Sequence, residues 1–442
     1  MSRQINSVAV MGTGTMGAGI AALCANAGCD VLFLDIPARE GERNSIAAGA
    51  LARMQGGKSP MLKDAAAAAR ITIGNFDDDM DKVAGCDWIV EVVLEDLAIK
   101  QSLFKRLEAA RRDGSILSTN TSGIMLKAIT EGMPERLQRD IAVTHFFNPV
   151  LVMKLVELVP GEKTEAEVTR ALAGFLSEQL GKGVVWAKDT VNFIANRIGC
   201  FWLLAGLLEG DAVLDEGYDI EDIDAAMGAP LGVPPTGLYG LVDLVGLDVL
   251  GLVIENLKQN LPADDAGRAY LKFPAPVQRM LENRQIGRKV GAGFYRMSKT
   301  EDGGRLKETF DLKSESWRVA KTAALDPAHQ SLEGLLTADD ALGRFAWTVM
   351  GGTALYAADL VPDISEDVVN VDRAMRWGFN WRQGPFEIID ALGADAVIAR
   401  LEAEGRPLPK MLQVLREAGA KSFYRNDGKE FLGVDGQYHP VP

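Results

Sequence analysis

A histidine and a glutamate twelve positions apart form the most reactive combination in this chain. His145 is one of only three histidines, and Glu157 ends the apolar run that follows it. Histidine titrates near neutral pH, and a carboxylate can hold the imidazole ring and support its charged form. The pair therefore predicts general acid/base chemistry, in which a proton moves to or from a bound molecule.

A glycine-rich turn near the start of the chain predicts a dinucleotide site. A short apolar strand over residues 7–11 leads into Gly12-Thr13-Gly14-Thr15-Met16-Gly17, and a helical pattern follows. The first glycine permits a tight turn, the second lets the backbone approach a pyrophosphate, and the third lets the helix pack on the strand. The helix N-terminus offers N–H groups to the phosphates. We expect cofactor contacts from Gly12, Gly14, Thr15, Met16 and Gly17.

The residue that ends the next predicted strand indicates which dinucleotide binds. Residues 31–34 are apolar, and Asp35 follows Gly17 by eighteen positions. A carboxylate there accepts hydrogen bonds from ribose hydroxyls and repels a 2′-phosphate, which favours NAD over NADP. The same residues also allow a simpler interpretation, in which an unrelated sheet carries the turn and Asp35 caps a strand.

Strand and helix patterns alternate through residues 1–187. Apolar strand patterns recur at 88–93, 115–119, 141–144 and 153–159, with helical stretches between them. Such alternation predicts an α/β domain with a mostly parallel, doubly wound sheet of the Rossmann type. Ligands of these sheets bind beyond the carboxyl ends of the strands. We expect the polar residues after these strands, including His145, to converge on the edge that carries the glycine turn.

The composition indicates a large folded protein of several domains. The chain has 442 residues, 47% of them apolar, and a formal charge of −14. This length exceeds what one core organises, and the negative charge argues against a nucleic acid or an acidic membrane as partner. We find no apolar run long enough for a membrane span and no signal pattern. The four cysteines lack metal-ligand spacing, so we expect reduced thiols, a cytoplasmic location and no metal site.

Taken together, the motifs resemble those of the L-3-hydroxyacyl-CoA dehydrogenase family, the NAD enzymes of fatty acid beta-oxidation. The resemblance covers nearly the whole chain, in the family's order. It rests on the glycine turn through Gly19, Val90-Glu91 with Glu95 and Lys100, Asn120-Thr121-Ser122, His145-Phe146-Phe147-Asn148-Pro149 with Lys154-Leu155-Val156-Glu157, and Lys188-Asp189-Thr190 with Asn196-Arg197.

The resemblance implies a reaction and four catalytic residues. The reaction is the reversible, NAD-dependent oxidation of an (S)-3-hydroxyacyl-CoA to the 3-ketoacyl-CoA. His145 takes the proton of the 3-hydroxyl while the neighbouring carbon passes a hydride to the nicotinamide, and Glu157 supports the imidazolium. Ser122 and Asn196 hydrogen-bond the reacting oxygen.

The resemblance also implies binding residues around this centre. Glu95, Lys100 and Asn120 match family positions near the cofactor, and Asn148 lies in the motif beside the substrate. Coenzyme A is polyanionic, so an acidic protein needs local cations to bind it. Such cations occur in the family's basic region, where this chain has Arg53, Lys58 and Lys63, although a solvated helix face explains these three equally well.

Each catalytic assignment has a purely structural alternative. His145 could be a core histidine at a strand end, and Glu157 a carboxylate on an exposed strand. Ser122 could cap a helix that begins before Ile124, and Asn196 could cap or bridge helices. The chain also departs from the family pattern near the cleft, with Val191-Asn192 in place of Pro-Gly and Leu151 in place of proline.

Helical patterns dominate after residue 187, and two segments there resemble each other. Residues 224–248 parallel 372–395, and the sequence Phe-Tyr-Arg recurs at 294–296 and 423–425. This repeat predicts two all-α domains related by duplication, 188–297 and 339–442, with 298–338 as a polar linker. Gly343 stands in the second copy where the first has Asn196, so we expect that copy to have a structural role.

The resemblance implies partners and leaves two other functions open. Single-copy relatives dimerise through the helical domain, so we expect a monomer with an internal pseudo-dimer, or a homodimer. Two-copy relatives often belong to multifunctional proteins, which makes enoyl-CoA hydratase or thiolase expected associates and this chain a short form or a fragment. The alternatives are a dehydrogenase of another small hydroxy acid, such as a sugar acid, and a non-catalytic dinucleotide-binding protein like a lens crystallin of this fold.

Overall fold

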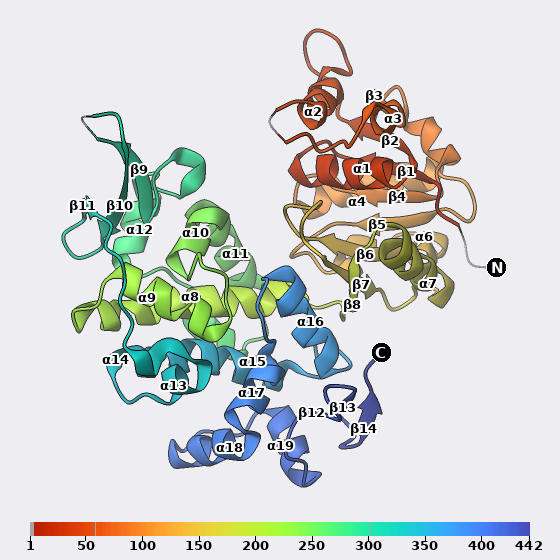
Figure 1. Cartoon of the computed structure of the whole chain (residues 1–442). Helices are drawn as coiled ribbons and strands as arrows, with labels where there is room; N and C mark the ends of the chain where they lie inside the picture. Colours follow the sequence, from red (N-terminus) through yellow and green to blue (C-terminus); the bar gives the residue numbers. More distant parts are fainter. Residues whose placement is uncertain (1–3, 58, 301) are drawn as a thin grey trace. The chain divides into compact units, whose positions relative to one another are not determined.

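The computed structural model describes residues 4–57, 59–300 and 302–442. The chain forms two compact units, one ending at Ile194 and the other beginning at Ala195 (Figure 1). The first is α/β and the second is mostly helical, as the sequence predicts. No helix within the described ranges is both long and apolar enough to cross a membrane.

The first unit extends past the predicted boundary at residue 187 because the following segment is bonded into it. The Asp189 carboxylate accepts hydrogen bonds from the backbone N–H groups of Leu126 and Lys127, at 2.6 and 2.7 Å. The backbone N–H of Ile194 donates to Glu157 at 3.0 Å. Residues 188–194 therefore belong to the α/β unit.

An eight-stranded sheet forms the centre of the first unit, in the order β3-β2-β1-β4-β5-β6-β7-β8. The strands from β3 to β6 run parallel, which is the order of a dinucleotide-binding fold. Strand β7 is antiparallel to β6, and β8 is parallel to β7. The strands are β1 (Ser7–Met11), β2 (Asp30–Asp35), β3 (Ile71–Asn75), β4 (Trp88–Glu91), β5 (Ile116–Thr119), β6 (Ile141–Phe146), β7 (Leu155–Pro160) and β8 (Gly183–Trp186).

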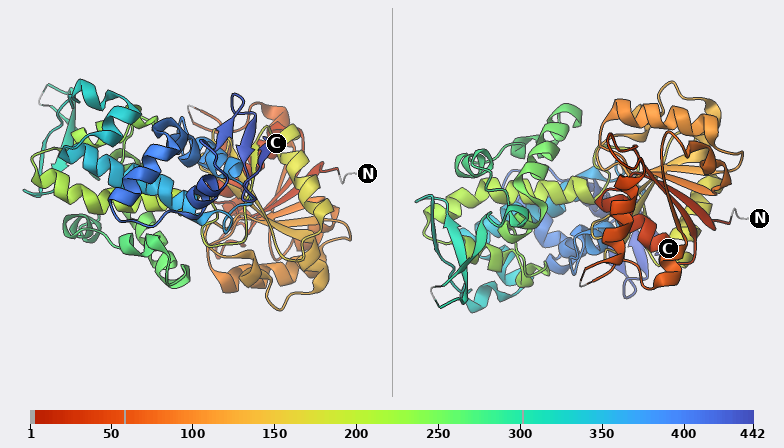
Figure 2. Two further views of the ribbon diagram at one scale, coloured as in Figure 1. Left: turned by 90° about the horizontal axis from the view of Figure 1, so that it is seen from below. Right: turned by 90° about the horizontal axis from the view of Figure 1, so that it is seen from above.

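Helices lie on both faces of this sheet (Figure 2). Over one face, α1, α2 and α7 share a buried core with the strands, in which Ile20, Phe33, Trp88, Phe146 and Leu172 take part. Burying one such side chain contributes about 1.5–3 kcal/mol, so this shared core is what holds the helices against the strands. The helices are α1 (Thr15–Asn26), α2 (Ser45–Gln55), α3 (Ala65–Ala69), α4 (Leu97–Ala110), α5 (Leu126–Thr130), α6 (Glu135–Asp140) and α7 (Ala166–Gly174).

A long apolar helix, α8, organises the second unit. It packs against α14, α15 and α16 from much later in the chain. The helices are α8 (Ala195–Asp215), α9 (Ile220–Ala226), α10 (Tyr239–Val245), α11 (Leu247–Asn260), α12 (Ala275–Glu282), α13 (Leu332–Thr337), α14 (Ala341–Ala346), α15 (Gly352–Leu360), α16 (Val368–Gly378), α17 (Pro385–Leu392), α18 (Ala394–Ala403) and α19 (Lys410–Glu417).

The second unit is not all-α, because it also holds two small antiparallel sheets. One consists of β9 (Tyr295–Lys299), β10 (Arg305–Asp311) and β11 (Ser316–Val319). The other consists of β12 (Tyr424–Arg425), β13 (Glu430–Leu432) and β14 (Tyr438–Pro440). Their residues are mostly half-buried and many are polar, so these strands lack the apolar alternation by which a strand is recognised in sequence.

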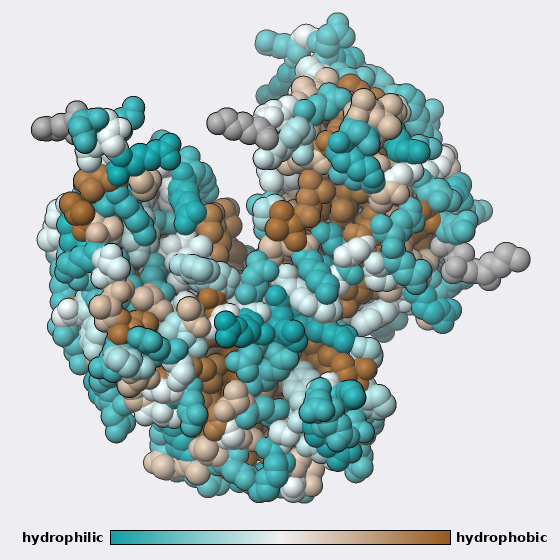
Figure 3. Space-filling view, in the orientation of Figure 1, coloured by the Kyte–Doolittle hydropathy of each residue, from teal (hydrophilic) through white to brown (hydrophobic). Residues whose placement is uncertain are grey.

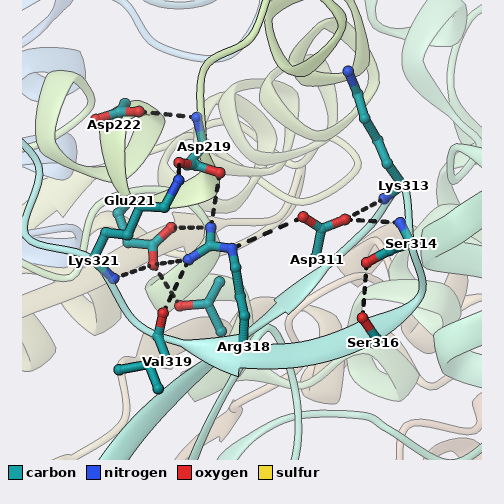
Figure 4. Close-up of polar contacts among 11 residues, drawn as sticks. Asp219, Glu221, Asp222, Asp311, Lys313, Ser314, Ser316, Arg318, Val319 and Lys321 are labelled. Atoms are coloured by element: carbon teal, nitrogen blue, oxygen red, sulfur yellow. Dashed lines mark hydrogen bonds and ion pairs between the residues drawn. The ribbon is translucent and has the colours of Figure 1, made fainter.

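The stretch 298–338, expected to be a linker, contains most of the first small sheet. Arg318 on β11 anchors it, since its guanidinium donates to both Glu221 carboxylate oxygens at 2.7 and 2.8 Å and to Asp219 at 3.0 Å (Figure 4). Burial by itself raises the pKa of Glu221. Hydrogen bonds from Arg318 and Thr309 outweigh this effect and lower the pKa to about 2. Charged contacts hold β11 to α9, while buried Leu312, Leu335 and Leu336 also pack within the stretch, so the expectation of a linker is wrong.

A buried hydrogen-bond network joins α9 and α10 to β9. Asp224 accepts from the Tyr295 hydroxyl at 2.7 Å and from the backbone N–H of Tyr239 at 2.6 Å. Asp243 accepts from the backbone N–H groups of Phe294 and Tyr295, at 2.7 and 2.8 Å. The two aspartates thus fix the strand to the helices.

The same geometry occurs again near the C-terminus. Asp372 accepts from the Tyr424 hydroxyl at 2.7 Å and from the backbone N–H of Phe386 at 2.8 Å. Asp390 accepts from the backbone N–H groups of Phe423 and Tyr424, at 2.7 and 2.8 Å. Three of these four hydrogen bonds repeat the residue types and distances of the first network, and in the fourth Phe386 at 2.8 Å stands in place of Tyr239 at 2.6 Å.

Candidate active site

The glycines of the turn between β1 and α1 differ in what surrounds them. Gly12 has φ +120°, and a Cβ there would lie 2.6 Å from the carbonyl oxygen of Val92. A Cβ on Gly17 would lie 1.9 Å from the oxygen of Gly12, whereas one on Gly14 would meet nothing within 4 Å. The packing of the chain itself requires Gly12 and Gly17, while Gly14 leaves open space beside the turn.

The N-terminus of α1 supplies hydrogen-bond donors at this open space. Gly14 is the N-cap residue, and no side chain of the described residues caps the helix. Gly14 and Thr15 are exposed. The first N–H groups of a helix have no partner within it and attract anions, so the amides of Thr15, Met16 and Gly17 suit a pyrophosphate.

Asp35 lies at the end of β2, next to the turn. One of its carboxylate oxygens accepts from the Thr13 backbone N–H at 2.7 Å and from the Thr13 hydroxyl at 2.5 Å. The other accepts from the backbone N–H of Ile36 at 2.7 Å. Two carboxylate oxygens offer about four acceptor positions, so ribose hydroxyls can still bind this half-buried group.

A buried lysine joins two glutamates behind the ends of β4 and β5. The Lys100 ammonium lies 2.8 Å from Glu91 and 3.1 Å from Glu95, and Lys100 is only 1% exposed. The Thr119 hydroxyl donates to the second oxygen of Glu91 at 2.6 Å. The ammonium therefore faces these acids, and Lys100 acts on its surroundings through them.

Glu95 in turn fixes the loop after β5. One carboxylate oxygen accepts from the Thr121 hydroxyl at 2.6 Å and from the backbone N–H groups of Ser122 and Gly123, both at 2.9 Å. Burial raises the pKa of Glu95, but the Lys100 charge and these hydrogen bonds outweigh it and lower the pKa overall. The loop is thereby held with the Ser122 side chain exposed.

The structure removes one alternative for Ser122. Helix α5 begins at Leu126, its N-cap residue is Met125, and its first N–H groups donate to Asp189. Ser122 therefore does not cap this helix. Asn120, just before the loop, accepts from the backbone N–H of Phe146 at 2.9 Å and so ties the end of β5 to the end of β6.

His145 and Glu157 form a buried pair across β6 and β7. They are direct register partners, so their side chains lie on the same face of the sheet. His145 Nδ1 is 2.7 Å from Glu157 Oε2, with the residues 5% and 0% exposed. An Nδ1–H that donates to the carboxylate leaves Nε2 as the basic nitrogen of the neutral ring. The glutamate is not on an exposed strand, and the pair suits proton transfer at Nε2.

Aromatic side chains flank the imidazole. The His145 ring centroid lies 4.6 Å from that of Phe147 and 5.7 Å from that of Phe193. Phe193 follows Asn192, and both have positive φ, at +51° and +60°. Asn192 stands where the family pattern has glycine. Among the other residue types, asparagine is one of those that adopt this left-handed conformation most readily. Asparagine therefore suits the positive φ that the backbone has at this position.

A second buried lysine fixes the loop between β6 and β7. The Lys182 ammonium donates to the carbonyl oxygens of Val150 and, at 2.7 Å, Met153. Val150 packs on α1, where a Cβ on Gly19 would lie 2.7 Å from it. Burial lowers the pKa of Lys182. The sequence gives no signal for this role, because a lone lysine before a short strand resembles any surface lysine.

The remaining predicted residues lie outside this buried framework. Asn148 is exposed on the loop after β6, and Arg53 is exposed on α2. Lys63 is also exposed, with its ammonium bonded to the backbone oxygen of Asn26. Lys58 lies outside the described residues. Asn196 is half-buried in the first turn of α8, in the second unit.

The first unit thus gathers its predicted polar groups at the carboxyl ends of β1, β2, β4, β5 and β6. Apolar side chains are also exposed here, namely Ile36, Leu94 and Ile99. Figure 3 shows apolar surface on this unit at the level of α1. Apolar walls with a few convergent polar groups are the usual surroundings of a bound cofactor. Among the described residues, no group of three or more His, Cys, Asp or Glu could hold a metal ion.

An open α/β sheet with this strand order, glycine turn and acidic residue after the second strand defines a dinucleotide-binding domain. Residues 7–190 match the family model described as 3-hydroxyacyl-CoA dehydrogenase, NAD binding domain. Residues 193–297 match the model described as 3-hydroxyacyl-CoA dehydrogenase, C-terminal domain. The chain belongs to the 3-hydroxyacyl-CoA dehydrogenase family, and its first unit is that family's NAD-binding domain.

Individual relatives agree with this assignment. A probable 3-hydroxyacyl-CoA dehydrogenase of Bacillus subtilis is 35% identical over 465 residues, which cover 100% of this chain and 58% of the relative. The mitochondrial hydroxyacyl-coenzyme A dehydrogenase of Sus scrofa is 33% identical, with 66% of this chain and 91% of the relative covered. The crystal structure of 3-hydroxybutyryl-CoA dehydrogenase from Escherichia coli has a TM-score of 0.70 and 25% identity, covering 94% of this chain and 99% of that one. The chain thus spans little more than half the length of its Bacillus subtilis relative.

Proposed function

We propose that this chain catalyses the reversible, NAD-dependent oxidation of an (S)-3-hydroxyacyl-CoA to the 3-ketoacyl-CoA in fatty acid beta-oxidation. The observation that carries the proposal is the buried His145–Glu157 pair, on the sheet whose strand ends also bear the glycine turn. A proton acceptor and a dinucleotide site in one unit are what alcohol oxidation requires. The names of the relatives supply the substrate class.

The buried pair suits the proton half of this reaction. His145 Nε2 takes the proton of the 3-hydroxyl in oxidation and returns it in reduction. Glu157 keeps the ring in the tautomer with Nδ1 protonated and stabilises the imidazolium that forms. Bound NAD supplies the hydride acceptor. The Ile194 backbone N–H, 3.0 Å from the other Glu157 oxygen, holds the carboxylate in place.

Other residues of the family motifs complete the proposed site. Ser122 and Asn196 hydrogen-bond the reacting oxygen, and Asn148 contacts the substrate. Cofactor contacts come from Gly12, Gly14, Thr15, Met16, Gly17, Asp35, Glu95 and Asn120, with Lys100 acting through its two glutamates. Arg53 and Lys58 are assigned to the anionic part of coenzyme A.

The proposal includes a duplication within the helical part, with copies at 188–297 and 339–442. Its support is the two matching networks, in which Asp224, Asp243 and Tyr295 correspond to Asp372, Asp390 and Tyr424. The second copy lacks the asparagine and cannot simply regain it, since a Cβ on Gly343 would lie 2.4 Å from the Ala338 oxygen.

From the duplication we infer an oligomeric state. The second copy takes the place of a partner subunit, so the chain is a monomer, although it can associate with an enoyl-CoA hydratase or a thiolase. Sedimentation that gives the mass of one chain at all concentrations supports this inference. A dimer that persists on dilution contradicts it.

The function is tested with acetoacetyl-CoA and NADH. We expect turnover to fall sharply with free acetoacetate, which lacks the CoA handle, and with NADPH. A series of 3-ketoacyl-CoA substrates with acyl chains of about four to about sixteen carbons then defines the size of the acyl site. Equal activity on free hydroxy acids indicates a different substrate class, and NADH binding without any turnover indicates a non-catalytic protein.

A further inference from the structure

Arg197, the residue after Asn196, is buried and held by two distant segments of the second unit. Its Nε atom donates to the Tyr356 hydroxyl at 2.6 Å, and its guanidinium forms an ion pair with Asp265. The Tyr356 hydroxyl donates in turn to Asp265 at 2.9 Å, which closes a triangle. The Arg197 and Asp265 side chains are only 4% and 5% exposed.

The triangle constrains the start of α8. A buried guanidinium is stable only when its donors are bonded, so Arg197 is confined to the position that Tyr356 and Asp265 define. Tyr356 also stacks on Phe201, with ring centroids 4.3 Å apart and planes at 15°. Arg197 and Phe201 are four residues apart on one helix face. Tyr356 therefore contacts α8 at two successive turns.

The contact joins the two proposed copies of the helical domain. Tyr356 lies on α15, in the region assigned to the second copy, whereas Arg197 and Asp265 lie in the first. The second copy carries glycine at the position of the proposed catalytic asparagine. It nevertheless supplies a hydroxyl to the residue that follows this asparagine in the first copy.

We propose that Tyr356 is a positioning residue for the active site, which fixes the first turn of α8 through Arg197 and so sets the position of Asn196. This inference rests on the proposed function, in which Asn196 hydrogen-bonds the reacting oxygen. The second copy thereby acts on catalysis in the first, in addition to packing against it.

The test compares two tyrosines around the same ring. Tyr356→Phe removes the bonded hydroxyl and retains the stacking. Tyr270→Phe is the matched control, because Tyr270 packs edge-on against Phe201 at 5.1 Å and its hydroxyl has no hydrogen bond within the described residues. We expect Tyr356→Phe to lower kcat for acetoacetyl-CoA reduction roughly tenfold, since small displacements of a catalytic group are costly. The KM for NADH stays unchanged, and Tyr270→Phe has the kcat of the wild type.

A double-mutant cycle separates positioning from general stability. In an Asn196→Ala background, Tyr356→Phe should cause no further fall in kcat, because the residue through which it acts is gone. A fall of equal size in both backgrounds, a neutral Asn196→Ala, or a neutral Tyr356→Phe overturns the proposal. If Tyr356→Phe does not fold, Asp265→Asn replaces it in the same cycle, with the same criteria. Absence of wild-type turnover contradicts the proposed function itself, whereas normal wild-type turnover with additive or absent effects contradicts only this inference.

Discussion

The Nδ1 atom of His145 lies 2.7 Å from Oε2 of Glu157, across the junction where β7 runs antiparallel to β6. In an antiparallel pair, directly opposite residues project their side chains to the same face. The reversal of the chain after β6 therefore brings together two groups that are twelve residues apart. This relationship carries the proposed chemistry.

Replacing the histidine tests its role in proton transfer. His145→Gln removes the imidazole, and we expect kcat to fall roughly a hundredfold to ten-thousandfold, the usual contribution of a general acid or base. NADH binding, measured by fluorescence titration, stays as in the wild type. His439→Gln is the control, because the half-buried His439 lies near the C-terminus and pairs there with Asp435. A His145→Gln enzyme with nearly normal turnover excludes the assigned role.

Replacing the glutamate tests the tautomer. In Glu157→Gln the amide oxygen can still accept from the Ile194 N–H, so the amide nitrogen faces His145 Nδ1 and donates to it. The ring proton then moves to Nε2, which can no longer accept the substrate proton, and we expect oxidation to slow by at least about a hundredfold. The measurement is kcat for 3-hydroxybutyryl-CoA oxidation. Wild-type kinetics in this variant contradict the supporting role of Glu157.

Asp35 is expected to select NAD through its charge. Asp35→Asn keeps the approximate shape but not the charge that repels a 2′-phosphate, so the ratio of kcat/KM for NADPH to that for NADH should rise roughly tenfold. Asp30→Asn is the control at the other end of β2, where Asp30 forms a surface ion pair with Arg70. An unchanged ratio in Asp35→Asn refutes the ribose assignment.

Substitutions at two glycines of the turn are expected to affect folding and cofactor binding differently. Gly17→Ala places a Cβ 1.9 Å from a backbone oxygen, so it should lower the unfolding temperature as well as NADH affinity. Gly14→Ala meets no atom of the protein within 4 Å, so it should fold normally and lose affinity for NADH alone. Calorimetry and fluorescence titration measure the two effects. Full NADH affinity in Gly14→Ala places the pyrophosphate elsewhere.

Buried aspartates make stability depend on pH. Burial raises the pKa of Asp224 to about 7, despite hydrogen bonds from Tyr295, Tyr239 and Gly240, against about 3.9 in an unfolded chain. The folded state therefore favours the protonated acid. The contribution of Asp224 to the free energy of unfolding is therefore complete below about pH 4 and is lost as the pH rises through about 7.

A variant at this position isolates the effect. Asp224→Asn does not titrate, so its unfolding temperature should fall less than that of the wild type between about pH 5 and about pH 8. A residual slope is expected from Asp243 and Asp390, whose pKa values burial raises to about 6. The exposed Asp427→Asn should follow the wild type. Equal slopes in wild type and Asp224→Asn would falsify the assignment to Asp224.

Sequence by itself determined the features that depend on neighbouring residues. The glycine turn from Gly12 to Gly17 is visible because a tight turn and close helix packing each need glycine at a set position. The parallel strands β1, β2, β4, β5 and β6 are visible because burial makes most of their residues apolar, whereas β3 (Ile71–Asn75), with Thr72 exposed and Asn75 at its end, was not predicted. The His145–Glu157 pair could be proposed from its motif and residue types, before its geometry was known.

Tertiary structure alone decided which polar groups are buried and what they contact. Lys100 and Lys182 have neighbours in sequence like those of surface lysines. The Lys100 ammonium nevertheless joins two glutamates, and the Lys182 ammonium binds two loop carbonyls. Arg318 attaches β11 to Glu221 by hydrogen bonds, within a stretch whose composition is typical of a linker. Tyr356 reaches Arg197 across 159 positions of sequence. These outcomes depend on which distant segments meet in space, and local periodicity carries no information about that because burial and hydrogen bonding are properties of the assembled fold.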